Sequence, residues 1–263
     1  MATLVVAALL GVFALTQRGK FQADIQALLR QHQQALVHEA ATDLRERLDE
    51  YLGLVQRTAA QAGHVNFASP QEALRYFNSI SPVSTLFDGM FIVGLDGRIS
   101  ASFPHVQGVV GLDVHDRDYF KEVVIVGQPT ISSPLRNRVG GAPNIVFAAP
   151  IFDDAGRITG VFCASLGLLR PNFLGDLRNM RIGANGYVFV VQRGNHPMFV
   201  IHPDDNKLLA ETTIEPAIAN ALAEMPTDDT GPLVITENII ATGWTLGSWP
   251  LPHRQRRQHR IRE

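Results

Sequence analysis

The stretch FDGMFIVGLDGRISASF, residues 87–103, alternates between apolar residues and small or polar ones, and Asp96-Gly97 separates its two halves. An Asp-Gly pair between two alternating runs is the strongest short-range signal for a β-hairpin, because glycine readily adopts the positive φ of a tight hairpin turn. The stretch therefore predicts two antiparallel strands joined by this turn.

The hairpin begins a longer pattern of short strands. The sequence predicts a helix of one or two turns at residues 115–127, a strand with a break at 129–137, and two further strands at 141–153 and 156–168. Residues 64–168 are thus expected to hold about five strands with helices on their flanks.

A second, smaller copy of the pattern follows. Its predicted elements are a short helix at 171–179, a hairpin at 186–192 and 198–203, a helix at 215–225 and closing strands at 231–239 and 243–249. Two consecutive antiparallel units that mix strands and helices indicate the α+β class.

The segment before the hairpin predicts an unusually long helix. Residues 21–62 contain no Pro and only one Gly, and their apolar residues recur at spacings of three and four, which forms one stripe on a helix. At 1.5 Å per residue, a helix of about 40 residues spans about 60 Å, more than a compact lobe requires. Ser69-Pro70-Gln71-Glu72 then predicts a capping box, with Glu72 reaching back, at the start of a helix that runs to about Ile80.

The N-terminus carries an apolar run of intermediate length. From Ala2 to Leu15 only Thr3 and Gly11 are not strongly apolar. A membrane span needs about 20 apolar residues, and the apolar region of a signal peptide about 7–15. Because no basic segment precedes the run and no cleavage site follows it, we interpret residues 1–17 as a partial transmembrane anchor. A buried N-terminal helix of a soluble protein is the alternative.

The formal net charge of -2 is the sum of two unlike parts. Residues 249–263 contain five Arg and one Glu, which leaves 18 basic and 24 acidic residues, a net charge of -6, in the rest of the chain. This balance does not indicate a nucleic-acid binder. We interpret the basic tail as non-native, the result of a frameshift or truncation; binding of anionic lipid or nucleic acid by the tail is the alternative.

Several short motifs follow one another in the order of a known family. They are the Asp-Gly hairpin, Gly111-Leu112-Asp113-Val114-His115-Asp116-Arg117-Asp118-Tyr119-Phe120, Ile131-Ser132, Ala149-Pro150-Ile151-Phe152-Asp153, Gly160-Val161, residues 181–190 and His202-Pro203-Asp204. Over roughly residues 20–248, this order resembles the double-Cache, or tandem PAS-like, sensor domains of bacterial transmembrane receptors.

The resemblance implies a long N-terminal helix followed by two PAS-like antiparallel-sheet lobes. The expected parts are a stalk helix at 18–62, a membrane-distal ligand-binding lobe at 63–170 and a membrane-proximal lobe at 171–248. The implied setting is the bacterial inner (cytoplasmic) membrane, with periplasmic or extracellular lobes and a homodimer formed through the long helix. The implied output domain, a diguanylate cyclase, histidine kinase or chemotaxis domain, is absent from this chain.

The resemblance also implies a ligand site in the distal lobe. Arg117 and Tyr119 lie in the segment expected to cover the pocket, where a guanidinium can hold a carboxylate through two charge-assisted hydrogen bonds and a phenol can donate another. Ser132 and Ser133, beside the strand break, are further candidates for ligand contact. The alternative for Arg117 is a surface ion pair with one of three nearby aspartates, Asp113, Asp116 and Asp118.

Two positions depart from the amino-acid-sensing members of the family. Those members carry Arg-x-Trp-Tyr where this chain has Arg117-Asp118-Tyr119-Phe120, and an Asp that holds the ligand ammonium where this chain has Ser165. Burying an ammonium without a carboxylate partner is costly. We therefore expect a small organic anion, such as a carboxylate, rather than an α-amino acid. Phe147 and Phe162 are expected in the core rather than at the ligand.

Enzyme and metal interpretations have little support in the sequence. Ala164-Ser165-Leu166-Gly167 lacks the first glycine of a nucleophile elbow, and Cys163 lies within a predicted strand as a core thiol. His196 and His202 belong to no triplet with zinc spacing. We expect no catalytic residue, no metal and no cofactor. A cell-envelope binding or scaffold protein without signalling output is the alternative function, and an extracytoplasmic hydrolase is a third.

Overall fold

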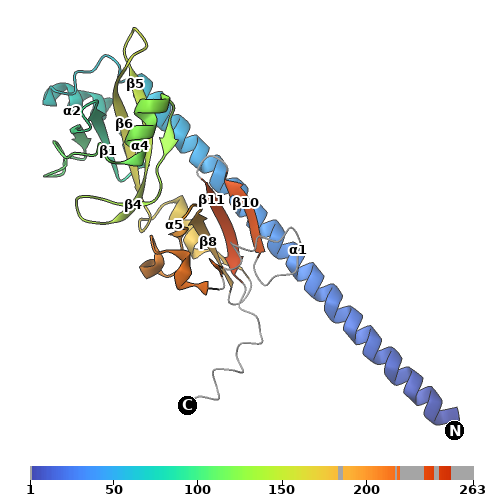
Figure 1. Ribbon diagram of the computed structural model, residues 1–263. Coiled ribbons are helices and arrows are strands. Elements are labelled where there is room, and N and C mark those ends of the chain that lie inside the picture. Colours follow the sequence, from blue (N-terminus) through green and yellow to red (C-terminus); the bar gives the residue numbers. More distant parts are fainter. Residues whose placement is uncertain (1, 183–185, 217, 220–233, 240–242, 250–263) are drawn as a thin grey trace.

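The computed structural model describes residues 2–182, 186–216, 218–219, 234–239 and 243–249. The chain forms one long helix and two antiparallel sheets, which lie one after the other along that helix (Figure 1). The two sheets come from consecutive parts of the sequence, so each pattern of short strands folds into a sheet of its own.

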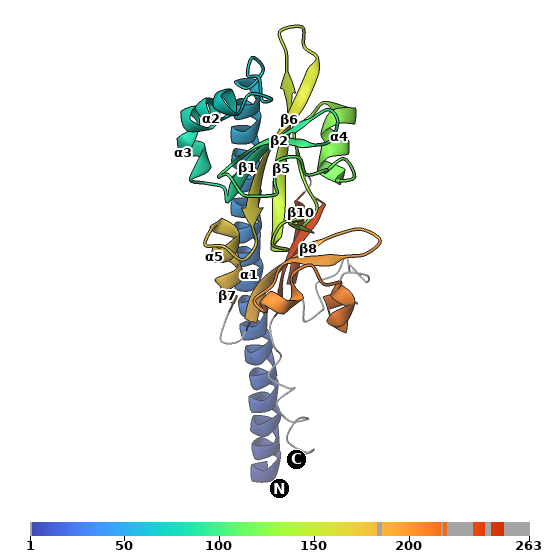
Figure 2. The same ribbon diagram turned by 90° about the vertical axis from the view of Figure 1, so that its left-hand side faces the viewer.

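Helix α1 spans Ala2–Ala60 and joins the predicted anchor and stalk without a break. Figures 1 and 2 show both sheets beside its C-terminal half, while its N-terminal half extends beyond them. Accordingly, Val37 is fully buried, whereas Phe21 and Leu28 are each 66% exposed. Within the described residues, we find no helix with both the length and the apolar character that crossing a membrane requires.

The first sheet consists of β1 Gly89–Gly94, β2 Ile99–Phe103, β3 Thr130–Ile131, β4 Leu135–Arg136, β5 Pro143–Phe152 and β6 Ile158–Gly167. Its strand order is β2-β1-β6-β5-β3, with β4 also paired to β5. The predicted hairpin is confirmed, because β1 pairs with β2 and Gly97 adopts a φ of 75° in the turn. The side chain of Asp96 supports that turn by accepting a hydrogen bond from the amide of Arg98 at 3.0 Å.

Three helices flank the first sheet: α2 Pro70–Ser79, α3 Ser81–Ser84 and α4 Asp118–Val126. The Ser69 hydroxyl caps α2 by accepting from the amide of Glu72 at 3.4 Å, as predicted. Glu72 reaches further back than a capping box requires: its Oε2 accepts from the amide of Asn66 at 3.1 Å. The reason is that the amide of Ser69 already donates to the carbonyl oxygen of Asn66 at 3.0 Å.

The second sheet consists of β7 Arg181–Ile182, β8 Gly186–Gln192, β9 Met198–Ile201, β10 Val234–Ile239 and β11 Trp244–Trp249. Its order is β10-β11-β8-β7, with β9 also paired to β8. Helix α5 Phe173–Asn179 leads into this sheet, and two short 3-10 helices, η1 Asp205–Lys207 and η2 Thr212–Ile214, follow β9. The helix predicted at 215–225 lies mostly outside the described residues. Of the tail predicted at 249–263, only Trp249 is described, and it belongs to β11.

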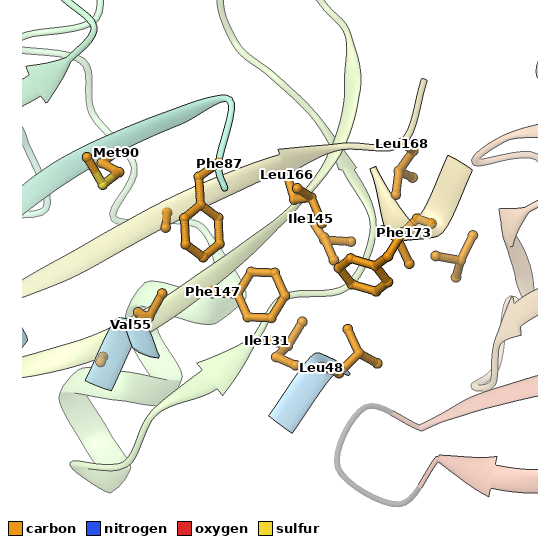
Figure 3. Packing of buried hydrophobic residues seen from close by; sticks show 14 of the residues in the cluster. Leu48, Val55, Phe87, Met90, Ile131, Ile145, Phe147, Leu166, Leu168 and Phe173 are labelled. Atoms are coloured by element: carbon orange, nitrogen blue, oxygen red, sulfur yellow. The ribbon is translucent and has the colours of Figure 1, made fainter. Parts of the chain in front are cut away.

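One apolar core joins α1 to both sheets. It contains buried residues of the helix, the first sheet and the second sheet, among them Leu48, Val55, Phe147, Phe162, Val190 and Trp244. Figure 3 shows Leu48 and Val55 of α1 beside the ring of Phe147, and that ring packs edge to face on Phe87 with centroids 5.7 Å apart. Burying one such aromatic side chain contributes about 1.5–3 kcal/mol. The prediction that Phe147 and Phe162 lie in the core is confirmed.

These elements confirm the predicted fold class, an α+β chain in which a long N-terminal helix precedes two antiparallel-sheet lobes. We call β1 to β6 with α2, α3 and α4 the first lobe, and β7 to β11 with α5, η1 and η2 the second lobe. In each lobe one face of the sheet packs on α1. The other face, which we call the outer face, packs on α4 in the first lobe and carries a separate small cluster in the second.

Candidate functional site

The outer face of the first sheet carries a cavity of about 210 Å³. The strand register pairs Ser165 of β6 with both Gly89 of β1 and Val146 of β5, so these three residues share one face and line the cavity. Apolar residues of the loop between β2 and α4, among them Val109 and Leu112, cover it. The cavity therefore lies between the sheet and the segment that crosses over it.

Arg117 directly precedes α4 and lines this cavity. Its Nη2 donates a hydrogen bond to the carbonyl oxygen of Arg136 in β4 at 3.1 Å, which ties the start of α4 to the neighbouring strand. A single bond to one carbonyl leaves the other donors of the guanidinium fork available. Arg117 can therefore offer two parallel donors to an anion inside the cavity.

Two of the three aspartates near Arg117 have other partners in the part of the chain that the structure describes. Asp113 pairs with His115 at 2.7 Å and with Arg98 at 3.8 Å. Asp116 forms an ion pair with Arg138, and the hydrogen bond from that guanidinium lowers the pKa of the Asp116 carboxyl. Since no ion pair joins Arg117 to a described carboxylate, the surface-cluster alternative does not account for this residue.

Tyr119 lies in the first turn of α4 and also lines the cavity. Only 3% of the residue is exposed, and burial raises the pKa of its phenol well above the ordinary value. The phenol therefore keeps its proton at any physiological pH. Its hydroxyl can serve as a neutral donor at the cavity that Arg117 also lines.

The three predicted serines lie in different surroundings. Ser165 lines the cavity, and its hydroxyl donates to the carbonyl oxygen of Gly89 at 3.2 Å. The hydroxyl of Ser132 accepts from the amide of Val146 at 2.9 Å and donates to the carbonyl oxygen of Ser133 at 2.7 Å. Neither Ser132 nor Ser133 is among the residues that line the cavity. The structure thus brings Arg117, Tyr119 and Ser165 together, and ligand contact by Ser132 and Ser133 stays a prediction.

Four further polar residues at the cavity were not expected from the sequence: Asp88, Ser102, Asn137 and Arg138. Asp88 accepts hydrogen bonds from the amide of Gly167 at 2.6 Å and from Nε of Arg170 at 3.0 Å. The hydroxyl of Ser102 is buried and has no partner among the described residues. The alternation of small polar and apolar residues in β2 was a usable signal for Ser102, but nothing local marked Asp88, whose partners lie about 80 positions further on.

The residues considered for catalysis or metal binding lie apart from this arrangement. Cys163 is fully buried within β6, and burial raises the pKa of its thiol well above the ordinary value, so it stays an unreactive core group. His196 pairs with Glu211 at 3.1 Å on the surface of the second lobe. Within the described ranges, no three His, Cys, Asp or Glu side chains gather closely enough to hold a metal ion.

Taken together, the cavity combines mostly apolar walls with a few donors. The charged donors are Arg117 and Arg138, of which Arg138 is already paired with Asp116. The neutral donor is Tyr119, and the hydroxyls of Ser102 and Ser165 add further polar contacts. An apolar cleft with a small number of convergent polar groups is the usual form of a small-molecule site. The arrangement is suited to holding a small molecule rather than to transforming it.

Comparisons with known proteins agree with this fold. A protein-family model described as a Cache domain matches residues 17–248. The ligand-binding domain of the Pseudomonas aeruginosa amino-acid chemoreceptor PctC, in complex with GABA, is 16% identical; the match covers 81% of this chain and 96% of that one, with a TM-score of 0.60. The ligand-binding domain of the Pseudomonas fluorescens chemoreceptor CtaA, in complex with L-serine, is 16% identical over 84% of this chain and 96% of that one, with a TM-score of 0.63.

An extracellular ligand-binding receptor from Desulfohalobium retbaense is 17% identical, and the match covers 82% of this chain and 39% of that one, with a TM-score of 0.65. No curated protein sequence matches the chain. At these identities the solved structures show a common fold. The resemblance identified from the sequence motifs is confirmed by the family match over most of the chain, and we conclude that the chain belongs to the Cache domain family.

Proposed function

We propose that this chain is the extracytoplasmic small-ligand sensor of a membrane-bound receptor and that the cavity of the first lobe binds a small carboxylate. The observation that carries the proposal is the guanidinium of Arg117, which lines the cavity without an ion pair to a described carboxylate. Tyr119 adds a protonated phenol on the same wall. A carboxylate is the group that a guanidinium fork and a neutral hydroxyl donor match best.

The proposal favours an amine-free acid over an α-amino acid. Ser165 offers a hydroxyl where a carboxylate is needed to hold an ammonium. The one carboxylate found on the cavity lining, that of Asp88, already accepts from the side chain of Arg170 and from a backbone amide. The related chemoreceptor domains were solved with GABA and with L-serine. Both molecules carry a carboxylate, which is the part of the ligand that the proposal transfers to this chain.

We also propose a homodimer formed through α1, anchored in the bacterial inner membrane by the apolar N-terminal run. Beyond the lobes, α1 exposes an apolar stripe made of Phe21, Ile25 and Leu28, which are 66%, 41% and 66% exposed. The spacings of four and three place these side chains on one face of the helix. A second copy of the same stripe is a self-complementary partner. In such a dimer, closure of the cavity on its ligand would shift the first sheet against α1 and bias the helix pair between two arrangements.

A thermal-shift panel on the full chain tests the proposed ligand class. Amine-free acids such as acetate, propionate and lactate are compared with L-serine and GABA, and we expect the acids to raise the unfolding midpoint more. R117A should lose this response. R157A is the matched control, because it removes the same charge from an exposed turn of the first lobe, where Arg157 pairs with Asp153. A midpoint raised by L-serine or GABA and not by the acids would contradict the proposal.

A further inference from the structure

The outer face of the second lobe carries a buried polar cluster that the proposed function does not use. Along β8, Val188 and Val190 point into the core shared with α1, whereas Tyr187, Phe189 and Val191 belong to the cluster on the outer face. The segment that follows β9 crosses this outer face. It supplies three of the four side chains of the cluster, which we call the Glu215 cluster and which consists of Tyr187, His202, Lys207 and Glu215.

The centre of the Glu215 cluster is a carboxylate that receives several partners at once. Oε2 of Glu215 accepts a hydrogen bond from the hydroxyl of Tyr187 at 3.2 Å. Oε1 forms an ion pair with the ammonium of Lys207 and lies 3.3 Å from Nε2 of His202. The side chain of Glu215 is only 17% exposed. A cation, a phenol and an imidazole thus converge on one largely buried carboxylate.

Backbone contact fixes the tautomer of His202, whose Nε2 lies near the carboxylate of Glu215 without the geometry of a hydrogen bond. The amide of Asp204 donates to Nδ1 of His202 at 2.9 Å, so the neutral imidazole carries its proton on Nε2, toward Glu215. The imidazole is 3% exposed and lies between the rings of Tyr187 and Phe199, with centroids 5.2 Å and 5.0 Å away. Burial, reinforced by the charge of Lys207, lowers the pKa of His202. The negative charge of Glu215 is therefore balanced by Lys207.

The two lobes place the same kinds of group on their outer faces. The first lobe directs the guanidinium of Arg117 and the phenol of Tyr119 at a cavity. The second lobe directs the ammonium of Lys207 and the phenol of Tyr187 at a carboxylate that the chain itself supplies. We propose that the outer face of the second lobe is a carboxylate-binding site and that the side chain of Glu215 is its built-in ligand. The inference does not rest on the proposed function of the first lobe, because its residues all belong to the second.

Two consequences follow for the chemistry of the site. Its ligand class is a small monocarboxylate, since one cation and one hydrogen-bond donor hold a single carboxylate group and the imidazole of His202 lies 3.3 Å from it. The contact between the Glu215 carboxylate and Tyr187 also holds the segment from η2 to Glu215 against β8. An external carboxylate that takes the place of the Glu215 side chain therefore releases that segment. The site is thus closed while Glu215 occupies it and opens when the side chain is removed.

Chemical rescue on the full chain tests the proposal. E215A removes the built-in carboxylate and lowers the unfolding midpoint. Acetate or propionate should then raise the midpoint of E215A by about 2–4 °C more than that of the wild type, because only the variant has an empty site. Chloride at the same ionic strength should not do so. A shift of equal size in both proteins would overturn the proposal. Acetate that binds in the first lobe raises both midpoints alike, so it cancels in the difference between the two shifts.

A second measurement keeps the proposal falsifiable if E215A does not fold. The imidazole pKa of His202 is followed by nuclear magnetic resonance in E215Q and K207M, neither of which empties the site. We expect the pKa to fall in E215Q, which loses the neighbouring negative charge, and to rise in K207M, which loses the neighbouring positive charge. An imidazole pKa that is unchanged in both variants would show that the three groups do not converge, and would also overturn the proposal.

Discussion

The two lobes pack one face of their sheets on the same helix, but they differ in how the polar groups of the outer face are satisfied. In the first lobe, Arg117 and Tyr119 line a cavity of about 210 Å³. In the second lobe, Lys207 and Tyr187 meet the carboxylate of Glu215. The same kind of sheet can therefore leave its donor groups open toward a ligand, as in the first lobe, or fill them with a side chain of its own, as in the second.

The largest expected effect concerns what the lobes share, the core on α1. F147A removes a fully buried ring that packs against Phe87, and we expect the free energy of unfolding to fall by about 3–5 kcal/mol in denaturant titrations. F152A is the control, because Phe152 ends the same strand and is 42% exposed. If F147A lowered the free energy of unfolding no more than F152A, the core shared with α1 would not stabilise the chain as proposed.

The next largest effect concerns the open donor set of the first lobe. R117A removes the charged donor of the cavity, and we expect the dissociation constant for a small carboxylate to rise by roughly 10–150-fold, since hydrogen bonds to charged groups contribute about 1.5–3 kcal/mol. Calorimetry measures the change, with R157A as the control. Tight binding that survives in R117A would remove Arg117 from the site.

A carboxylate can also be introduced into the first lobe, which makes its cavity resemble the filled second lobe. S165D places a negative charge on the cavity wall beside Gly89. We expect binding of a small carboxylate to weaken about tenfold, because like charges in one cavity repel. S165N has the same shape without the charge and should weaken binding less. Equal losses in the two variants would indicate a steric effect instead.

The smallest effect is a pH dependence that belongs to the second lobe. The pKa of His202 is lower in the folded chain than its ordinary value of 6.5, chiefly because of burial. As the pH falls, His202 therefore takes up a proton in the unfolded chain before it does so in the folded one. Its contribution to stability is complete above about pH 6.5 and is lost as the pH falls below that value. The loss is about 1.4 kcal/mol per unit of difference between the two pKa values.

Thermal unfolding between pH 8 and pH 5 checks this dependence. H202N keeps an acceptor for the amide of Asp204 but does not titrate, so its midpoint should vary less over this range. Carboxylates with lowered pKa values, such as Asp113, contribute only at lower pH, because their ordinary value is 3.8. A wild-type profile as flat as that of H202N would contradict the assignment.

The sequence predicted those features that depend on near neighbours. The turn at Asp96-Gly97, the cap at Ser69 and the buried rings of Phe147 and Phe162 follow from local alternation and capping rules, and all are confirmed. The role of Glu72 was only partly predicted. The amide of Ser69, its expected partner, already donates to the carbonyl oxygen of Asn66, so Glu72 accepts from the amide of Asn66 instead.

The rest of the candidate site depends on long-range contacts that no local pattern encodes. Asp88 reaches the cavity at the N-terminal end of β1, where its carboxylate bonds the amide of Gly167, 79 residues later. Glu215 meets Tyr187 across 28 residues, in a segment whose sequence predicts only a helix start. Such groups are recognised only once the register of the sheet and the path of the covering segment are known.

The most direct test of the first-lobe ligand site is a calorimetric titration of the wild type, R117A and E215A with the same amine-free acid, the one that stabilises the wild type most. We expect one molecule bound per wild-type chain and binding at least roughly tenfold weaker in R117A. In E215A we expect the first-lobe binding to be retained and a second site to be added. Unchanged binding in R117A would contradict the assignment of the ligand to the first lobe, because the guanidinium of Arg117 would then not be needed.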